Sequence, residues 1–185
     1  MPLYKSNTST PVLGQFSLKG KVCLVTGGAR GIGLEIVRGM AEAGADVALT
    51  YITSTDAPET AAKIARETHQ KIEAFQTDVT NRQNIAHTMQ KVLKVFGRLD
   101  FVVANAGVCR QISSLEYTEE TFAKDYSVNV DGVMWTAQAA GQIFKAQGYG
   151  NLIITASVSS VLVNIPQPQT SYNSSKAAGC ILERI

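Results

Sequence analysis

Residues 22–33 read VCLVTGGARGIG, and this stretch decides the fold. Its first five residues form a short apolar run typical of a buried strand, and the glycines that follow predict a tight turn. Beyond the turn, four apolar residues recur at the spacing of one helix face: Ile32, Ile36, Val37 and Met40. A strand, a glycine-rich turn and a helix in this order are typical of a site that binds phosphate through backbone N–H groups and the helix dipole.

Apolar runs and helical patterns alternate along the rest of the chain. The expected strands after the first are residues 46–51, 72–76, 100–105 and 152–155. The expected helices include residues 58–69, a helix that Thr80 and Gln83 begin as a capping box, residues 118–146, and a last helix that carries Tyr172. This alternation predicts an α/β fold in which helices cover both faces of a doubly wound parallel sheet.

Composition and charge restrict the class of protein. With 45% hydrophobic and 17% charged residues, the 185-residue chain is long enough and apolar enough for one globular domain. Its formal net charge is +2 without a basic stripe, so we expect no nucleic-acid partner. No apolar run approaches the roughly 18 residues of a membrane span. The three cysteines are odd in number and widely spaced, and no metal-ligand spacing occurs.

The start of the chain is expected to lie outside the domain. Residues 1–17 are rich in Ser and Thr and lack the apolar stretch of a signal peptide. We therefore expect a flexible arm over residues 1–17, a dinucleotide-binding domain over residues 18–185, and a cytoplasmic location.

A phenol and an ammonium group share one face of the last expected helix. Tyr172 and Lys176 are four residues apart, and side chains at this spacing are neighbours on a helix. The cation favours the phenolate form, which makes the hydroxyl a usable proton donor or acceptor near neutral pH. Because the spacing is common by chance, its meaning depends on the glycine-rich turn upstream.

Four motifs follow one another along the chain: Thr26-Gly27-x-x-x-Gly31-x-Gly33, Asn105-Ala106-Gly107, Asn129-Val130-x-Gly132 and Tyr172-x-x-x-Lys176. With these motifs in this order, the chain from residue 18 onward resembles the short-chain dehydrogenase/reductase family. The sequence of residues 154–159 and 164–169 is similar to that of the fungal NADP-dependent polyol and carbonyl reductases of the mannitol, sorbose and xylulose type.

The resemblance implies hydride transfer between a nicotinamide and a secondary alcohol or ketone, with a sugar alcohol and a ketose as candidate substrates. Tyr172 would transfer the proton, Lys176 would bind the nicotinamide ribose, and Asn129 would hold a water that joins the lysine to solvent. The residues expected to bind the cofactor are Thr26, Gly27, Arg30, Gly31, Ile32, Gly33, Tyr51, Asp78, Val79, Asn105, Ala106, Gly107, Tyr172 and Lys176. Cys109 follows the Asn-Ala-Gly motif and is a candidate wall residue of the substrate site.

Two serines compete for the role of the donor that stabilises the carbonyl oxygen. Most family members place this serine thirteen residues before the tyrosine, which is Ser159 here. Alignment of the strand end instead gives Ser157, fifteen residues before Tyr172. We favour Ser157 because the reductases that the chain resembles carry the longer loop.

The expected cofactor is NADP(H). NAD-binding sites place an acidic residue at the end of the second strand, but this chain has Tyr51 there. No carboxylate would repel a 2′-phosphate, and the Arg30 guanidinium is placed to pair with it. Asp78 and Val79 match the family's adenine contact.

The family pattern also includes strands that would follow residue 185, so we expect a domain that is incomplete at its C-terminus. Two hypotheses follow. The first is an active NADP(H)-dependent oxidoreductase for a small-molecule alcohol or ketone. The second is a non-catalytic nucleotide-binding remnant or a regulatory subunit. In either case the resemblance implies a homo-oligomer, a dimer or tetramer, that packs through residues 118–146 and the Tyr172 helix.

Overall fold

The computed structural model describes residues 11–181, which form a five-stranded parallel sheet in the order β3-β2-β1-β4-β5. The strands are β1 (Val22–Val25), β2 (Asp46–Tyr51), β3 (Ile72–Gln76), β4 (Phe101–Ala104) and β5 (Asn151–Ile154). This order is that of a doubly wound nucleotide-binding sheet. The predicted fold class is therefore confirmed. Of the expected arm, residues 1–10 lie outside the described residues, and α1 (Val12–Gln15) is a single exposed turn.

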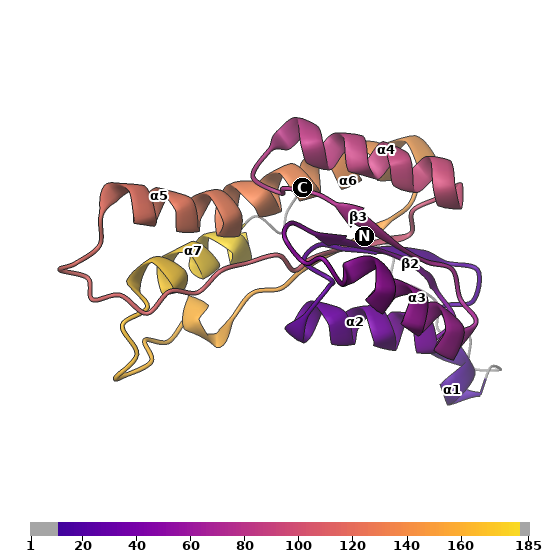
Figure 1. Ribbon diagram of the computed structural model, residues 1–185, viewed down its shortest axis with the longest axis horizontal. Helices are drawn as coiled ribbons and strands as arrows, with labels where there is room; N and C mark the ends of the chain where they lie inside the picture. Colours follow the sequence, from indigo (N-terminus) through magenta and orange to yellow (C-terminus); the bar gives the residue numbers. More distant parts are fainter. Residues whose placement is uncertain (1–10, 182–185) are drawn as a thin grey trace.

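Helices cover both faces of the sheet. The layer on one face consists of α2 (Gly31–Glu42) and α3 (Ala57–Thr68), and the layer on the other consists of α4 (Arg82–Phe96) and α6 (Gly132–Gln147) (Figure 1). Two further helices, α5 (Glu119–Tyr126) and α7 (Thr170–Ile181), lie side by side beyond the sheet (Figure 1). Within residues 11–181, no helix combines the length and the apolar character that crossing a bilayer requires.

Alternation along the buried strands divides the core in two. Leu24 of β1 and Val102 of β4 pack toward α4 and α6, whereas their neighbours Val25 and Val103 pack toward α2 and α3. Successive side chains of a strand point to opposite faces, so a strand covered on both sides must be apolar throughout. This explains why residues 22–25 form an unbroken apolar run rather than an alternating one.

Two expected helix features differ in the structure. The expected helix over residues 118–146 is α5 and α6 joined by a π-helical turn, Ser127–Asp131, which contains Asn129. The expected capping box at Thr80 is wrong: Asn81 caps α4 by accepting from the Asn84 N–H at 3.0 Å. The Thr80 N–H and hydroxyl both donate to the Asp78 carboxylate instead, at 2.9 and 2.7 Å, because a charged acceptor binds more strongly than a neutral one.

A buried carboxylate fixes the amino ends of the two central strands. Asp100 is 3% exposed, and its side chain accepts the Val22 N–H at 2.9 Å. Arg98 donates twice, at 2.8 and 2.6 Å, and Lys21 once, at 3.2 Å. Burial alone would raise the pKa of Asp100, but these hydrogen bonds outweigh it and hold the pKa below its ordinary value.

We expect Asp100→Asn to lower the free energy of unfolding at pH 7 by about 1–3 kcal/mol, because it removes charged hydrogen bonds from a buried site. The folded-state pKa is depressed, so the stabilisation is complete above the unfolded-state pKa and is lost as the pH falls through the folded-state value. Urea unfolding of both proteins should therefore show a difference that narrows below about pH 4. Equal stabilities of Asp100→Asn and the unmodified protein at pH 7 would show that the Asp100 hydrogen bonds do not stabilise the fold.

Candidate active site

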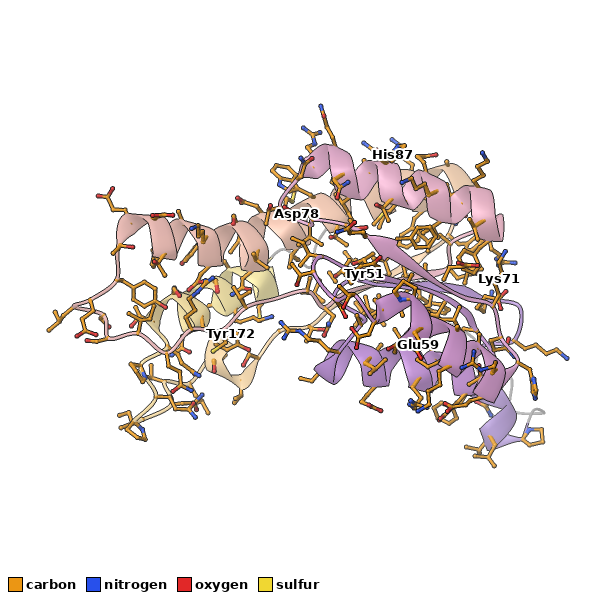
Figure 2. All side chains as sticks on the ribbon, in the orientation of Figure 1. Tyr51, Glu59, Lys71, Asp78, His87 and Tyr172 are labelled. Carbon is orange, nitrogen blue, oxygen red and sulfur yellow. The ribbon has the colours of Figure 1, made fainter. Side chains whose placement is uncertain are left out.

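A cleft of about 790 Å³ opens at the carboxyl ends of the strands. It lies where β1 has β2 on one side and β4 on the other, which is the point at which the chain reverses direction across the sheet. Its volume is in the range of small-molecule and cofactor sites. Tyr51 and Asp78 lie at the carboxyl edge of the sheet, and Tyr172 lies on the side of α7 (Figure 2).

The glycines of the turn bring its backbone into one wall of the cleft. Gly27 has a φ of 65°, and its N–H donates to the Thr50 hydroxyl at 3.2 Å. A Cβ on Gly33 would lie 2.2 Å from the Gly27 carbonyl oxygen and 2.5 Å from the Asn105 Nδ2. The first turn of α2 can therefore approach the β1–α2 turn closely enough for its N–H groups to face a pyrophosphate.

The ends of β1 and β4 are joined by side-chain hydrogen bonds. The Thr26 hydroxyl accepts the N–H groups of Asn105 and Ala106, both at 3.0 Å. The Asn105 Nδ2 donates to the Thr26 carbonyl oxygen at 3.0 Å. Thr26, expected to bind the cofactor, is buried and does not line the cleft. Its hydroxyl instead fixes the Asn105-Ala106-Gly107 segment, which does.

Tyr172 and Lys176 both line the cleft from the first turns of α7. The Lys176 Nζ lies 5.8 Å from the centroid of the Tyr172 ring and donates to the Thr155 carbonyl oxygen at 2.7 Å. Lys176 is only 6% exposed. This burial, partly offset by the nearby thiols, holds the pKa of Lys176 below its ordinary value. The lysine therefore lies in the cleft wall, where its ammonium group is oriented by a backbone carbonyl.

The two candidate serines have different environments. Ser157 lines the cleft with Tyr172, and its hydroxyl oxygen accepts the Ser159 N–H at 3.1 Å. Ser159 is buried, does not line the cleft, and accepts from the Asn164 side chain at 3.0 Å. Ser157, and not Ser159, therefore lines the same cleft as Tyr172.

Asn129 joins the loop after β4 to α7. Its Oδ1 accepts the Val108 N–H, and its Nδ2 donates to the Val108 carbonyl and to the Ser175 hydroxyl, all at 2.9 Å. A Cβ on Gly107 would lie 3.2 Å from the Asn129 Oδ1 and 3.4 Å from the Lys176 Nζ. Gly107 thus allows the loop, the asparagine and the lysine to lie together. The π turn that orients Asn129 is of a kind often found at functional sites.

The other end of the cleft presents few charges. Arg30, Tyr51, Thr53 and Ser54 line it, and Asp78 is the one carboxylate among the described lining residues. The Asp78 Oδ1 accepts both hydrogen bonds from Thr80 and is held in the turn after β3. No acidic side chain lies at the end of β2, so this end is open to an anionic group.

Sequence reasoning gave most of the residues that line the cleft. The expected lining residues Gly31, Ile32, Val79, Ala106 and Cys109 are also found there. It missed lining residues such as Ile52, Val108, Val128 and Thr155. These are apolar, or act through the backbone, so their side chains gave no signal in the sequence. Within residues 11–181, no three His, Cys, Asp or Glu residues gather as a metal site.

Comparison with known proteins places this geometry among oxidoreductases. The short chain dehydrogenase family profile matches residues 21–184. A sorbose reductase of Schizosaccharomyces pombe is 42% identical over 165 residues, which are 88% of this chain and 65% of the relative. An NADP-dependent mannitol dehydrogenase of Hypocrea jecorina is 38% identical over 177 residues, 94% of this chain and 66% of the relative.

A solved structure of another reductase has the same fold. The crystal structure of an NADPH-dependent 3-quinuclidinone reductase from Rhodotorula rubra superposes with a TM-score of 0.87 at 40% identity, over 96% of this chain and 68% of that one. The chain spans about two thirds of the length of the curated relatives it matches. The family profile covers nearly all of the described residues, including the glycine turn and the Tyr172 helix. The chain therefore belongs to the short-chain dehydrogenase family.

Proposed function

We propose that this protein is an NADP(H)-dependent oxidoreductase that transfers hydride between the nicotinamide and a secondary alcohol or ketone. The observation that carries the proposal is that Tyr172, Lys176 and Ser157 line the same cleft as the glycine turn. The glycine turn has the close packing that a dinucleotide site requires. A Cβ on Gly33 would overlap the backbone of Gly27 and the Asn105 side chain, so only glycine fits at this position. A side chain there would force the turn away from a bound pyrophosphate.

The side chains divide the chemistry of a carbonyl reduction among them. Bound NADPH supplies the hydride. Tyr172 donates its hydroxyl proton to the carbonyl oxygen as negative charge develops there, and Ser157 stabilises the same oxygen with a second hydrogen bond. Lys176 lies over the Tyr172 ring, so its ammonium stabilises the phenolate that the proton transfer leaves. In the oxidative direction the same groups act in reverse.

The residues expected to surround the adenosine of the cofactor support NADP(H) over NAD(H). The end of β2 carries Tyr51 in place of an acidic residue, and the Arg30 side chain lines the same part of the cleft. The relatives named for mannitol dehydrogenation and quinuclidinone reduction use NADP or NADPH.

Relatives named for sorbose and mannitol support a sugar alcohol or a ketose as the substrate. A homo-oligomer that packs through α5, α6 and α7 would cover Phe122 of α5, an aromatic side chain that is 38% exposed.

We expect Tyr172→Phe to lower the turnover of NADPH with a ketose or a small ketone by about 100-fold or more, because general acid catalysis contributes at least this factor. The dissociation constant of NADPH should stay within about twofold, since the ring remains in place. Absorbance of NADPH gives the rate, and fluorescence titration gives the binding. Full turnover by the variant would exclude Tyr172 as the acid. NADPH binding by the unmodified chain without oxidation by any carbonyl would instead favour the non-catalytic nucleotide-binding hypothesis.

Ser157→Ala and Ser159→Ala separate the two serines. We expect the first to reduce turnover by about 100-fold, as loss of an oxyanion donor does. The second should leave turnover within about twofold and lower the melting temperature, because it removes the hydrogen-bond partner of Asn164. A reversed pattern in the steady-state rates would assign the role to Ser159.

Arg30→Ala should weaken NADPH binding by about tenfold and leave NADH binding unchanged, because only NADPH carries the phosphate that the guanidinium would pair with. Arg30→Lys serves as the control that keeps the charge and loses the bidentate geometry, and should show an intermediate loss. Titration of each variant with both cofactors measures the ratio. An unchanged ratio in Arg30→Ala would show that Arg30 is a solvated charge without a role in selectivity.

A further inference from the structure

Asp125 is a buried carboxylate that lies outside the cleft. It occupies the last turn of α5 and is 1% exposed. Its Oδ2 accepts the Ser171 hydroxyl and, at 3.3 Å, the Tyr117 hydroxyl, and its Oδ1 is in contact with the Arg110 guanidinium. The Tyr117 and Ser171 hydroxyl oxygens lie 2.7 Å apart. One carboxylate therefore gathers two hydroxyl groups and a cation.

The groups bound to Asp125 come from the segments that build the nicotinamide end of the cleft. Arg110 and Tyr117 belong to the loop over residues 108–118, which begins at the cleft wall with Val108 and Cys109. Ser171 directly precedes Tyr172 in the first turn of α7. The carboxylate thus connects the loop over residues 108–118 to the helix that carries Tyr172 and Lys176.

A buried charge needs all of these partners. A carboxylate removed from water is stable only when it is paired and hydrogen-bonded, so Asp125 favours one arrangement of the loop and of α7 over others. Asn129 makes a second connection between the same two segments through Val108 and Ser175. Asp125 and Asn129, which make these two connections, are four residues apart. Asp125 lies in the last turn of α5, and Asn129 lies in the π turn that follows.

We propose that Asp125 is a positioning residue: through Arg110 and Ser171 it holds the loop over residues 108–118 and the first turn of α7 in the arrangement that binds the nicotinamide half of the cofactor. This inference rests on the proposed function. It also predicts that Asp125 has no effect on the adenosine half, which lies against the glycine turn and the ends of β2 and β3.

Asp100 provides a matched control. It is also a buried carboxylate bound to an arginine, but it lies at the amino ends of β1 and β4, at the opposite edge of the sheet from the cleft. Asp125→Asn and Asp100→Asn each replace a buried carboxylate by its neutral amide. A purely structural role predicts that both variants lose stability in the same way, without an effect on one half of the cofactor.

The experiment titrates each protein with NADPH and with adenosine 2′,5′-bisphosphate, which has the adenosine half and lacks the nicotinamide. We expect Asp125→Asn to weaken NADPH binding by about five- to tenfold, the effect of losing one or two charged hydrogen bonds, with bisphosphate binding within about twofold. Asp100→Asn should leave both within about twofold. Arg110→Lys, which keeps the charge, should recover part of the NADPH affinity that Arg110→Leu loses. Ser171→Ala removes one hydroxyl and serves if Asp125→Asn does not fold.

Amide hydrogen exchange gives a readout that needs no ligand. Exchange over residues 108–118 and 171–176 should be faster in Asp125→Asn than in Asp100→Asn, because only the first variant releases these segments. Equal loss of both ligands, no loss of either, or equal exchange in the two variants would overturn the inference. If the unmodified chain bound neither ligand, the proposed function would fail, and the exchange comparison would still decide whether Asp125 positions α7.

Discussion

The site depends on how closely the ends of β1 and β4 approach the first turn of α2. The Thr26 hydroxyl accepts two N–H groups from the β4 end, and the Asn105 side chain donates back across the same gap. Gly33 packs against Gly27 and Asn105 with no room for a side chain. These contacts lie beside the cleft at the point where the sheet order reverses, and the backbone of the glycine turn forms part of the cleft wall.

Much of this arrangement could be predicted from the sequence because its determinants are local. The unbroken apolar run over residues 22–25 reflects burial on both faces of the sheet. Gly27 reflects a left-handed backbone conformation, and Gly33 reflects a close contact that leaves no room for a side chain. Tyr172 and Lys176 follow from helical spacing together with the glycine-rich turn upstream. The sequence favoured Ser157 over Ser159 through the longer loop, and the structure adds that Ser157 lines the cleft whereas Ser159 is buried outside it.

The features that the sequence could not show depend on which of several local and distant partners a polar group binds. The expected capping box at Thr80 does not form, because the N–H and the hydroxyl of Thr80 donate to the Asp78 carboxylate instead. The π turn has no local signature, since Asn129 is drawn toward Val108 and Ser175, residues far away in the sequence. Asp125 gave no signal in the sequence, because the Arg110 and Ser171 side chains that surround it lie far from it along the chain. Such features come from tertiary contacts and are visible only in three dimensions.

The central claim is that one cleft binds the whole cofactor, with its reactive ring beside Tyr172. A crystal structure of the chain with bound NADPH tests this most directly. The account predicts the pyrophosphate against the β1–α2 turn, the 2′-phosphate near Arg30, and the nicotinamide within contact distance of Tyr172 and Lys176. A dinucleotide bound with its nicotinamide turned away from α7, or at another surface of the protein, would contradict it.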